Sequence, residues 1–77
     1  MTWIIEGFRR GQDELTAWYR LPESFSVETA AAWVGDWPDL VGSVFDVPEE
    51  RIPEMAALLG IEADPDVDYC LSDRDLG

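Results

Sequence analysis

Carboxylate side chains are the groups in this sequence whose types and spacing could most readily support chemistry. Asp64, Asp66 and Asp68 alternate in a single run, and Asp75 is the twelfth residue counted from Asp64. These positions match ligand positions of the calcium-binding loop between two helices. However, Tyr69 stands where such a loop needs a glycine, and Asp75 replaces the longer bidentate glutamate. We therefore expect no metal and no cofactor, and interpret the run as the solvated face of a strand.

The chain contains few other groups that could catalyse a reaction. It has no histidine to move protons near neutral pH and no lysine for Schiff-base chemistry. Cys70 is the single cysteine, and its neighbours Asp68 and Asp73 should raise the pKa of the thiol and so suppress the nucleophilic thiolate. We therefore predict that the protein is not an enzyme and that it functions by binding.

The formal net charge is −12 on 77 residues, from 17 acidic and 5 basic side chains. A charge of this size repels nucleic acid and anionic membranes, so the expected partner is a basic protein. The hydrophobic fraction of 47% nevertheless predicts a folded, single domain over residues 1–77. A lone cysteine, and the lack of a signal-like or membrane-spanning apolar stretch, favour a cytoplasmic location.

The acidic side chains are concentrated in the second half of the chain. Residues 1–35 hold five acids and three arginines, whereas residues 36–77 hold twelve acids and two arginines. We expect the second group to form one negative surface, with two tryptophans as exposed aromatic anchors. The residues predicted to contact a partner are Asp36, Asp39, Asp46, Glu49, Glu50, Glu54, Asp64, Asp66, Asp68, Trp18 and Trp37.

Three functions are compatible with such a surface. The first is inhibition of a basic toxin or enzyme by direct contact. The second is mimicry of nucleic acid, in which carboxylates replace phosphates in the groove of a DNA- or RNA-binding protein. The third is an acidic domain whose charge serves solubility or adaptation to salt and has no inhibitory role.

Hydrophobic patterning predicts an α+β domain with the element order β-β-α-α-β. Alternation indicates a hairpin of strands at residues 3–8 and 15–21 and a third strand at residues 67–72. A helix should begin after Ser24 or Ser26 and end at Gly35. Its apolar spacing should direct Val27, Ala30, Ala31 and Val34 towards the sheet.

Two further helices are predicted in the middle of the chain. One should begin at Pro38 and run to Phe45, weakened by Gly42. A turn at residues 47–51 should separate it from a helix that opens at Pro53 and ends at Gly60. The expected architecture is therefore a small three-stranded antiparallel sheet with two to three short helices on one face.

Four segments of the sequence carry a family resemblance. Residues 3–8, 19–22, 53–62 and 68–71 resemble a group of small, acidic bacterial proteins. That group is similar in size and charge to the immunity proteins encoded beside polymorphic or contact-dependent toxins. The resemblance assigns no binding residues. It implies an immunity or inhibitor protein that neutralises a basic cognate toxin or enzyme, such as a nuclease.

Overall fold

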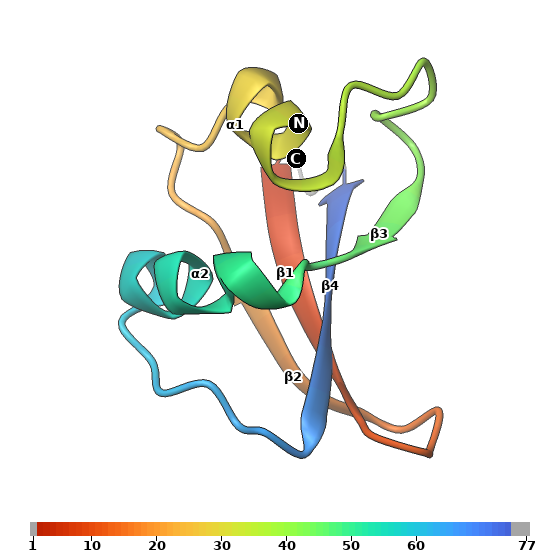
Figure 1. The fold of residues 1–77 in the computed structure, drawn as a ribbon, viewed down its shortest axis with the longest axis vertical. Helices are drawn as coiled ribbons and strands as arrows, with labels where there is room; N and C mark the ends of the chain where they lie inside the picture. The colour runs from red at the N-terminus through yellow and green to blue at the C-terminus, as the bar shows by residue number, and fades with distance from the viewer. Residues whose placement is uncertain (1, 75–77) are drawn as a thin grey trace.

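The computed structural model describes residues 2–74, and within them four strands form one antiparallel sheet (Figure 1). The central strand β1 (Thr2–Arg9) pairs with β2 (Leu15–Arg20) on one side and with β4 (Val67–Arg74) on the other. The short β3 (Val44–Asp46) borders β4, which gives the order β2-β1-β4-β3. The predicted α+β class is confirmed, but the predicted sheet lacked β3.

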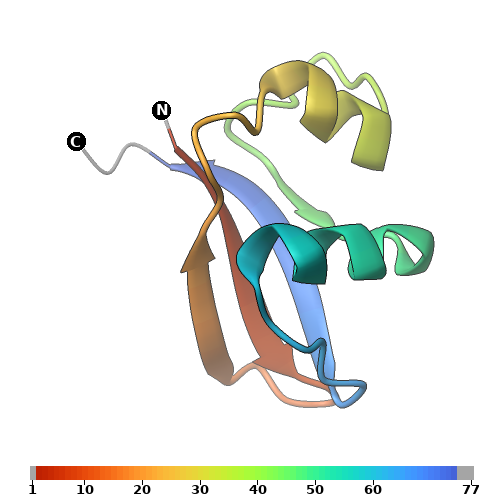
Figure 2. The same ribbon diagram turned by 90° about the vertical axis from the view of Figure 1, so that its left-hand side faces the viewer.

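The helices lie together on one side of the sheet (Figure 2). They are α1 (Val27–Val34), the 3₁₀ turn η1 (Glu49–Arg51) and α2 (Ile52–Leu59). Because successive side chains of a strand point to opposite faces, β1 directs Trp3 and Ile5 towards the helices, where both are buried in the core. Among residues 2–74, no helix lies on the other side of the sheet, which we call the open face.

The helix α1 begins as the sequence predicts. Ser26 is its N-cap residue, and the Ser26 hydroxyl accepts a hydrogen bond from the Thr29 N–H at 3.3 Å. Hydrogen bonds from its own backbone N–H and from Ser26 lower the pKa of Glu28 in the first turn. A lowered pKa means that the ionised carboxylate stabilises the folded state, and this contribution is lost as pH falls through that pKa. Gly35, at φ 105°, ends the helix.

The buried side of α1 differs from the prediction. Ala30 and Trp33 are buried, whereas Val27 is 43% exposed, and Ala31 and Val34 are only partly buried. The large Trp33 ring determines this orientation, because it packs edge-on against Phe25 with ring centroids 4.9 Å apart. The helix is therefore rotated so that its aromatic residue, and not its first valine, enters the core.

The predicted helix from Pro38 to Phe45 is wrong. Residues 38–43 form turns, and Val44–Asp46 is strand β3. Gly42 adopts a φ of 97°, a conformation that helices exclude, so the segment turns back towards β4. Leu40 is 5% exposed and anchors the turn in the core, while Val44 and Phe45 pair with β4. An otherwise unpaired edge of β4 thus outweighs a weak local helix signal.

The segment from residue 47 to residue 60 agrees with the prediction. The turn contains η1, and α2 follows it with Pro53 in its first turn and Gly60 in the left-handed conformation after its last residue. Met55 is fully buried, and Ile52 and Leu59 pack against the same core. The helical apolar spacing therefore identifies the buried side of α2 correctly.

Strand β4 has the predicted alternation with one correction. Tyr69 and Leu71 face the core and are buried, as expected from their spacing. Alternation predicts Ser72 on the wet face of β4, with Asp68 and Cys70, but Ser72 is only 2% exposed, and its hydroxyl oxygen has no hydrogen-bond partner among residues 2–74. Ser72 lies opposite Ile4 of β1 and Val44 of β3, so apolar neighbours on both sides exclude water from it.

Two serine variants should have opposite effects on stability. Replacing Ser72 with alanine removes a buried hydroxyl that lacks a partner, so the free energy of unfolding should rise by up to about 1 kcal/mol. Replacing the N-cap residue Ser26 with alanine should lower it by about 1 kcal/mol. Urea unfolding monitored by circular dichroism measures both. Equal destabilisation by the two variants would contradict this account of Ser72.

Candidate functional site

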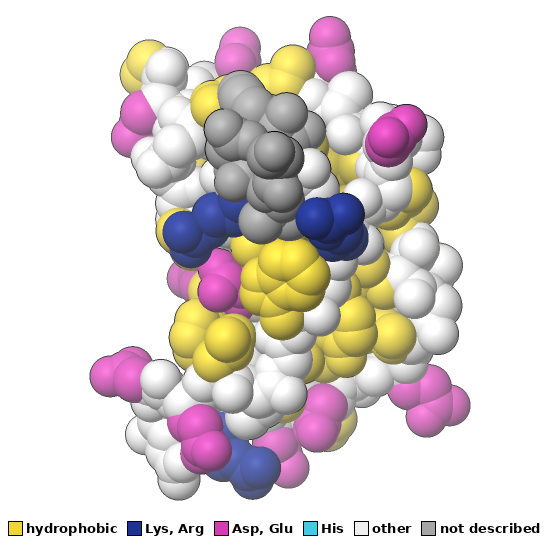
Figure 3. All heavy atoms as spheres, turned by 180° about the vertical axis from the view of Figure 1, so that it is seen from behind, with side chains coloured by type: hydrophobic (Ala, Val, Ile, Leu, Met, Phe, Trp, Pro, Cys, Tyr) yellow, Lys and Arg dark blue, Asp and Glu magenta, His cyan; other side chains and the backbone are white. Residues whose placement is uncertain are grey.

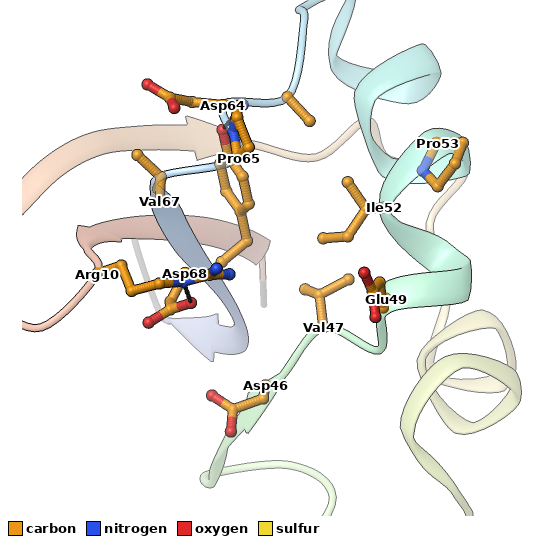
Figure 4. A pocket seen from close by; sticks show the side chains of 12 residues that line it. Arg10, Asp46, Val47, Glu49, Ile52, Pro53, Asp64, Pro65, Val67 and Asp68 are labelled. Atoms are coloured by element: carbon orange, nitrogen blue, oxygen red, sulfur yellow. Dashed lines mark hydrogen bonds and ion pairs between the residues drawn. The ribbon is translucent and has the colours of Figure 1, made fainter.

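A pocket of about 770 Å³ lies between the start of β4, the end of β3 and the start of α2 (Figure 4). Acidic side chains stand at its rim, and apolar side chains form its floor. We call it the acidic pocket. It is lined by Arg10, Asp46, Val47, Glu49, Ile52, Pro53, Ala63, Asp64, Pro65, Val67, Asp68 and Tyr69.

The shortness of β3 creates this pocket. Its three residues pair with positions 70–72 of β4, and one further backbone hydrogen bond joins the Val47 N–H to the Tyr69 carbonyl at 2.9 Å. The chain then turns at Pro48 into η1 and leaves β4. The first residues of β4, Val67 and Asp68, consequently have no paired strand on the side away from β1. Side chains of α2 and of the loop after it enclose the space.

Tyr69 connects the floor of the pocket to its rim. The Tyr69 side chain is buried, and its hydroxyl oxygen accepts a hydrogen bond from the Asp64 N–H at 2.9 Å. The Asp64 carboxylate in turn accepts from the Asp66 N–H at 2.8 Å, and the Asp64 carbonyl accepts from the Val67 N–H at 3.2 Å. These bonds make residues 64–67 a compact turn that holds Asp64 at the rim.

Arg10 attaches the β1–β2 turn to the same loop. Its N–H donates to the Asp66 carbonyl at 2.8 Å, and its guanidinium Nε lies 3.2 Å from Asp68 Oδ1. Both side chains of this ion pair are more than half exposed, so the pair adds little to stability. It does neutralise one of the four rim carboxylates. Asp46, Glu49 and Asp64 form no ion pair within residues 2–74.

A second, smaller hollow adjoins the acidic pocket. Its volume is about 390 Å³, and Asp46 lines both hollows. Trp37 borders it with 53% of its surface exposed, and the Trp37 indole N–H donates to the Val34 carbonyl at 2.6 Å. Asp39 stands beside it and accepts a hydrogen bond from the Ser43 hydroxyl at 3.0 Å. An exposed aromatic ring and two carboxylates therefore border the same surface.

The structure brings together only part of the predicted binding surface. The predicted binding residues that line the two hollows are Asp39, Asp46, Glu49, Asp64, Asp68 and Trp37. Asp36, Glu50 and Asp66 are exposed but line neither hollow, and Trp18 lies on the open face.

Glu54 lines neither hollow, and its carboxylate contacts both helices. It accepts a hydrogen bond from the Trp33 indole N–H at 2.6 Å and forms an ion pair with Arg51 at 3.1 Å. Arg51 also donates to the Ala32 carbonyl of α1 at 3.2 Å. Glu54 thus joins the two helices, and its charge is largely compensated by Arg51.

Sequence reasoning missed the apolar floor and the arginine at the rim. The alternation of β4 places Tyr69 on the core face, which was a usable signal for the floor. No local signal connects Val47 and Ile52 to this floor, because the pocket depends on where β3 ends. Arg10 reaches the rim only because β1 pairs with β4.

The aspartate run that resembles a calcium loop is engaged in other contacts. Asp64 binds the backbone of its own turn, and Asp68 pairs with Arg10. Asp75 lies outside the described residues. Within residues 2–74, no group of three or more metal-ligating side chains is close enough to hold an ion.

Cys70 lies next to the acidic pocket, on β4. Its thiol is 3.6 Å from Asp46 Oδ1, to which it can donate a hydrogen bond. Burial, followed by the charge of Asp46 and the hydrogen bond to it, raises the pKa of Cys70 to about 11. The thiol therefore stays protonated at neutral pH, where it is a poor nucleophile.

Comparisons of the chain with protein-family models, with curated proteins and with solved structures found no match. Among residues 2–74, the helices are too short and too polar to cross a lipid bilayer.

Cys70 should react slowly with thiol reagents. At pH 8, alkylation by iodoacetamide should be at least about tenfold slower than for an unfolded peptide, because a pKa near 11 leaves little thiolate. The rate should rise with pH towards 11, and Asp46→Asn should increase the rate at pH 8. Mass spectrometry of the labelled protein measures this, with Asp39→Asn as a control. An unchanged rate in Asp46→Asn would contradict the assigned influence of Asp46.

Removing the Tyr69 hydroxyl should loosen the rim. Tyr69→Phe leaves the ring in the core but deprives the Asp64 N–H of its acceptor, so the free energy of unfolding should fall by about 1 kcal/mol. Hydrogen exchange of the Asp64 amide, measured by NMR, should accelerate more than exchange of the amides in β1. Uniform acceleration throughout the chain would indicate general destabilisation and contradict a local role.

Proposed function

We propose that this protein is an immunity or inhibitor protein that binds and neutralises a basic toxin or enzyme, and that the acidic pocket receives basic side chains of that partner. A cytoplasmic location is part of the proposal. The partner class includes nucleases, because their substrate grooves are basic and a negative surface can cover them.

The observation that supports the proposal is that four carboxylates line the acidic pocket, whose floor is apolar. Asp46 is the last residue of β3, and Glu49 is the first residue of η1. Asp64 lies in the loop before β4, and Asp68 lies in β4. Within residues 2–74, only Asp68 of these four carboxylates has an arginine partner. A cationic group from outside could therefore pair with the other three.

The composition of the pocket suits an arginine or lysine side chain. The aliphatic stem of such a residue can lie on Val47, Ile52 and Tyr69, while its charged head reaches the rim carboxylates. Arginine fits such a site especially well, because its planar guanidinium can bind two carboxylates at once. Trp37, exposed beside the adjoining hollow, provides an aromatic surface for the same partner.

The net charge of the whole chain would speed this binding. A charge of −12 attracts a basic protein over distance and raises the association rate constant from the usual 10⁵–10⁶ towards roughly 10⁸–10⁹ M⁻¹ s⁻¹ at low salt. The contacts in the pocket and at Trp37 would then determine how slowly the complex dissociates. Binding, not catalysis, is the proposed activity, since the described residues provide no activated nucleophile beside the pocket.

The test pairs two variants of equal net charge. The site variant carries Asp46→Asn, Glu49→Gln, Asp64→Asn and Asp68→Asn. The control variant carries Asp13→Asn, Glu14→Gln, Glu23→Gln and Glu62→Gln, which removes four exposed carboxylates that line neither hollow. The probe is a fluorescently labelled, arginine-rich peptide, and stopped-flow fluorescence measures association with it.

We expect the site variant to associate at least about tenfold more slowly than the control variant. Equal rates for both variants would show that only total charge matters, and would contradict a role for the pocket. Unchanged rates for both would exclude electrostatic steering altogether. Competition with DNA or RNA for several unrelated nucleic-acid-binding proteins would instead favour mimicry of nucleic acid.

A further inference from the structure

The open face of the sheet lies on the opposite side from the helices. Strand alternation places Ile4 and Phe8 of β1, Trp18 and Arg20 of β2, Val44 of β3 and Ser72 of β4 on this face. Figure 3 looks onto it: hydrophobic side chains gather in the middle, and acidic side chains lie mainly towards the periphery.

Large apolar side chains of the open face are exposed on its outer strands. Trp18 of β2 is 44% exposed, and Val44 of β3 is 56% exposed. Leu15, opposite Phe8 at the start of β2, is 50% exposed. Ile4 and Ser72 in the middle of the face are only 1% and 2% exposed, so its exposed apolar groups lie on the outer strands. Exposed apolar groups on one face are typical of a contact surface.

Among residues 2–74, the charges of the open face nearly cancel, in contrast to those of the other surfaces. Strand alternation puts Glu6, Asp46 and Asp68 on this face, together with Arg20 and Arg74, and Arg10 joins Asp68 there. Glu6 pairs with Arg74 at 3.2 Å, and Asp68 pairs with Arg10 at the same distance. The remainder of residues 2–74 holds thirteen acids and only two arginines.

We propose that the open face is the interface between two copies of this chain. Two chains of charge −12 repel each other wherever their acidic surfaces meet, so the nearly neutral face is the one on which they can approach. A basic partner, by contrast, is attracted to the acidic surfaces. The inference does not depend on the proposed function, because Trp18, Arg20 and Val44 line neither hollow, although Asp46 and Asp68 border both the open face and the acidic pocket.

The strand order makes this face complementary to itself. A two-fold axis parallel to the strands lays β2 of one copy over β3 of the other, because these are the two outer strands. Trp18 and Arg20 then face the Val44–Asp46 strand of the other copy. Arg20, which has no ion pair within residues 2–74, can there reach Asp46 of the other copy.

Analytical ultracentrifugation of three proteins tests this interface. The wild-type chain should sediment as a dimer, and Trp18→Gln should weaken the dimer at least about thirtyfold. Leu58→Gln is the matched control, because Leu58 is 41% exposed but lies on α2, away from the open face. It should dimerise like the wild type. Circular dichroism confirms that each variant is folded.

Three results would overturn the proposal: a wild-type chain that stays monomeric up to about 1 mM, a Trp18→Gln dimer as tight as the wild type, or equal loss of the dimer in Leu58→Gln. A charge swap provides a second measurement. Arg20→Asp should weaken the dimer, and adding Asp46→Arg to the same chain should restore it. Failure of this rescue would exclude the strand arrangement described above.

The salt dependence separates this contact from binding to a basic partner. Salt screens the repulsion between two acidic chains, so the dimer should become tighter between about 0.05 and 0.5 M NaCl. Association with a basic probe should weaken over the same range. A dimer that weakens with salt would show that attraction between opposite charges outweighs the repulsion between the two acidic chains, and would contradict an interface on the neutral face.

Discussion

The pairing of β1 with β4 is the constraint on which the rest of this structure depends. Eight consecutive residue pairs join the first and last strands of the described chain, from Thr2 with Arg74 to Arg9 with Val67. This register directs Trp3 and Ile5 to the helices and Ile4 and Phe8 to the open face. A shift of one residue would exchange the two sets, so burial of the core strongly favours one register.

The same pairing determines where the acidic side chains meet. It brings Arg10 and the β1–β2 turn beside residues 64–68, which lie far away in the sequence. Strand β4 is fully paired with β1, but β3 covers only part of its other edge. The uncovered part becomes the wall of the acidic pocket. The geometry of the sheet, and not the local spacing of the aspartates, therefore decides which carboxylates act together.

The sequence predicted those elements whose signals are local. The alternation of β1, β2 and β4, the cap at Ser26 and the glycine after α2 each depend on neighbouring residues. Strand β3 was missed because it has only three residues, and two adjacent apolar residues, Val44 and Phe45, fit a helix as well as a strand. Their pairing with Ser72 and Leu71 is a tertiary contact that the local sequence does not indicate. The hydrogen bond from Trp33 to Glu54 was not predicted for the same reason, since nothing in the local sequence connects these two residues.

The sheet carries two kinds of surface, an acidic one around the pocket and a nearly neutral one on the open face, and Asp46 and Asp68 lie where the two meet. The central claim is that the acidic pocket binds basic side chains. NMR titration of the labelled protein with an arginine-rich peptide tests it directly. The account predicts the largest shifts at the amides of Val47, Glu49 and Asp64, and little change at the Trp18 indole. Shifts distributed evenly over all exposed carboxylates, or centred on the open face, would contradict it.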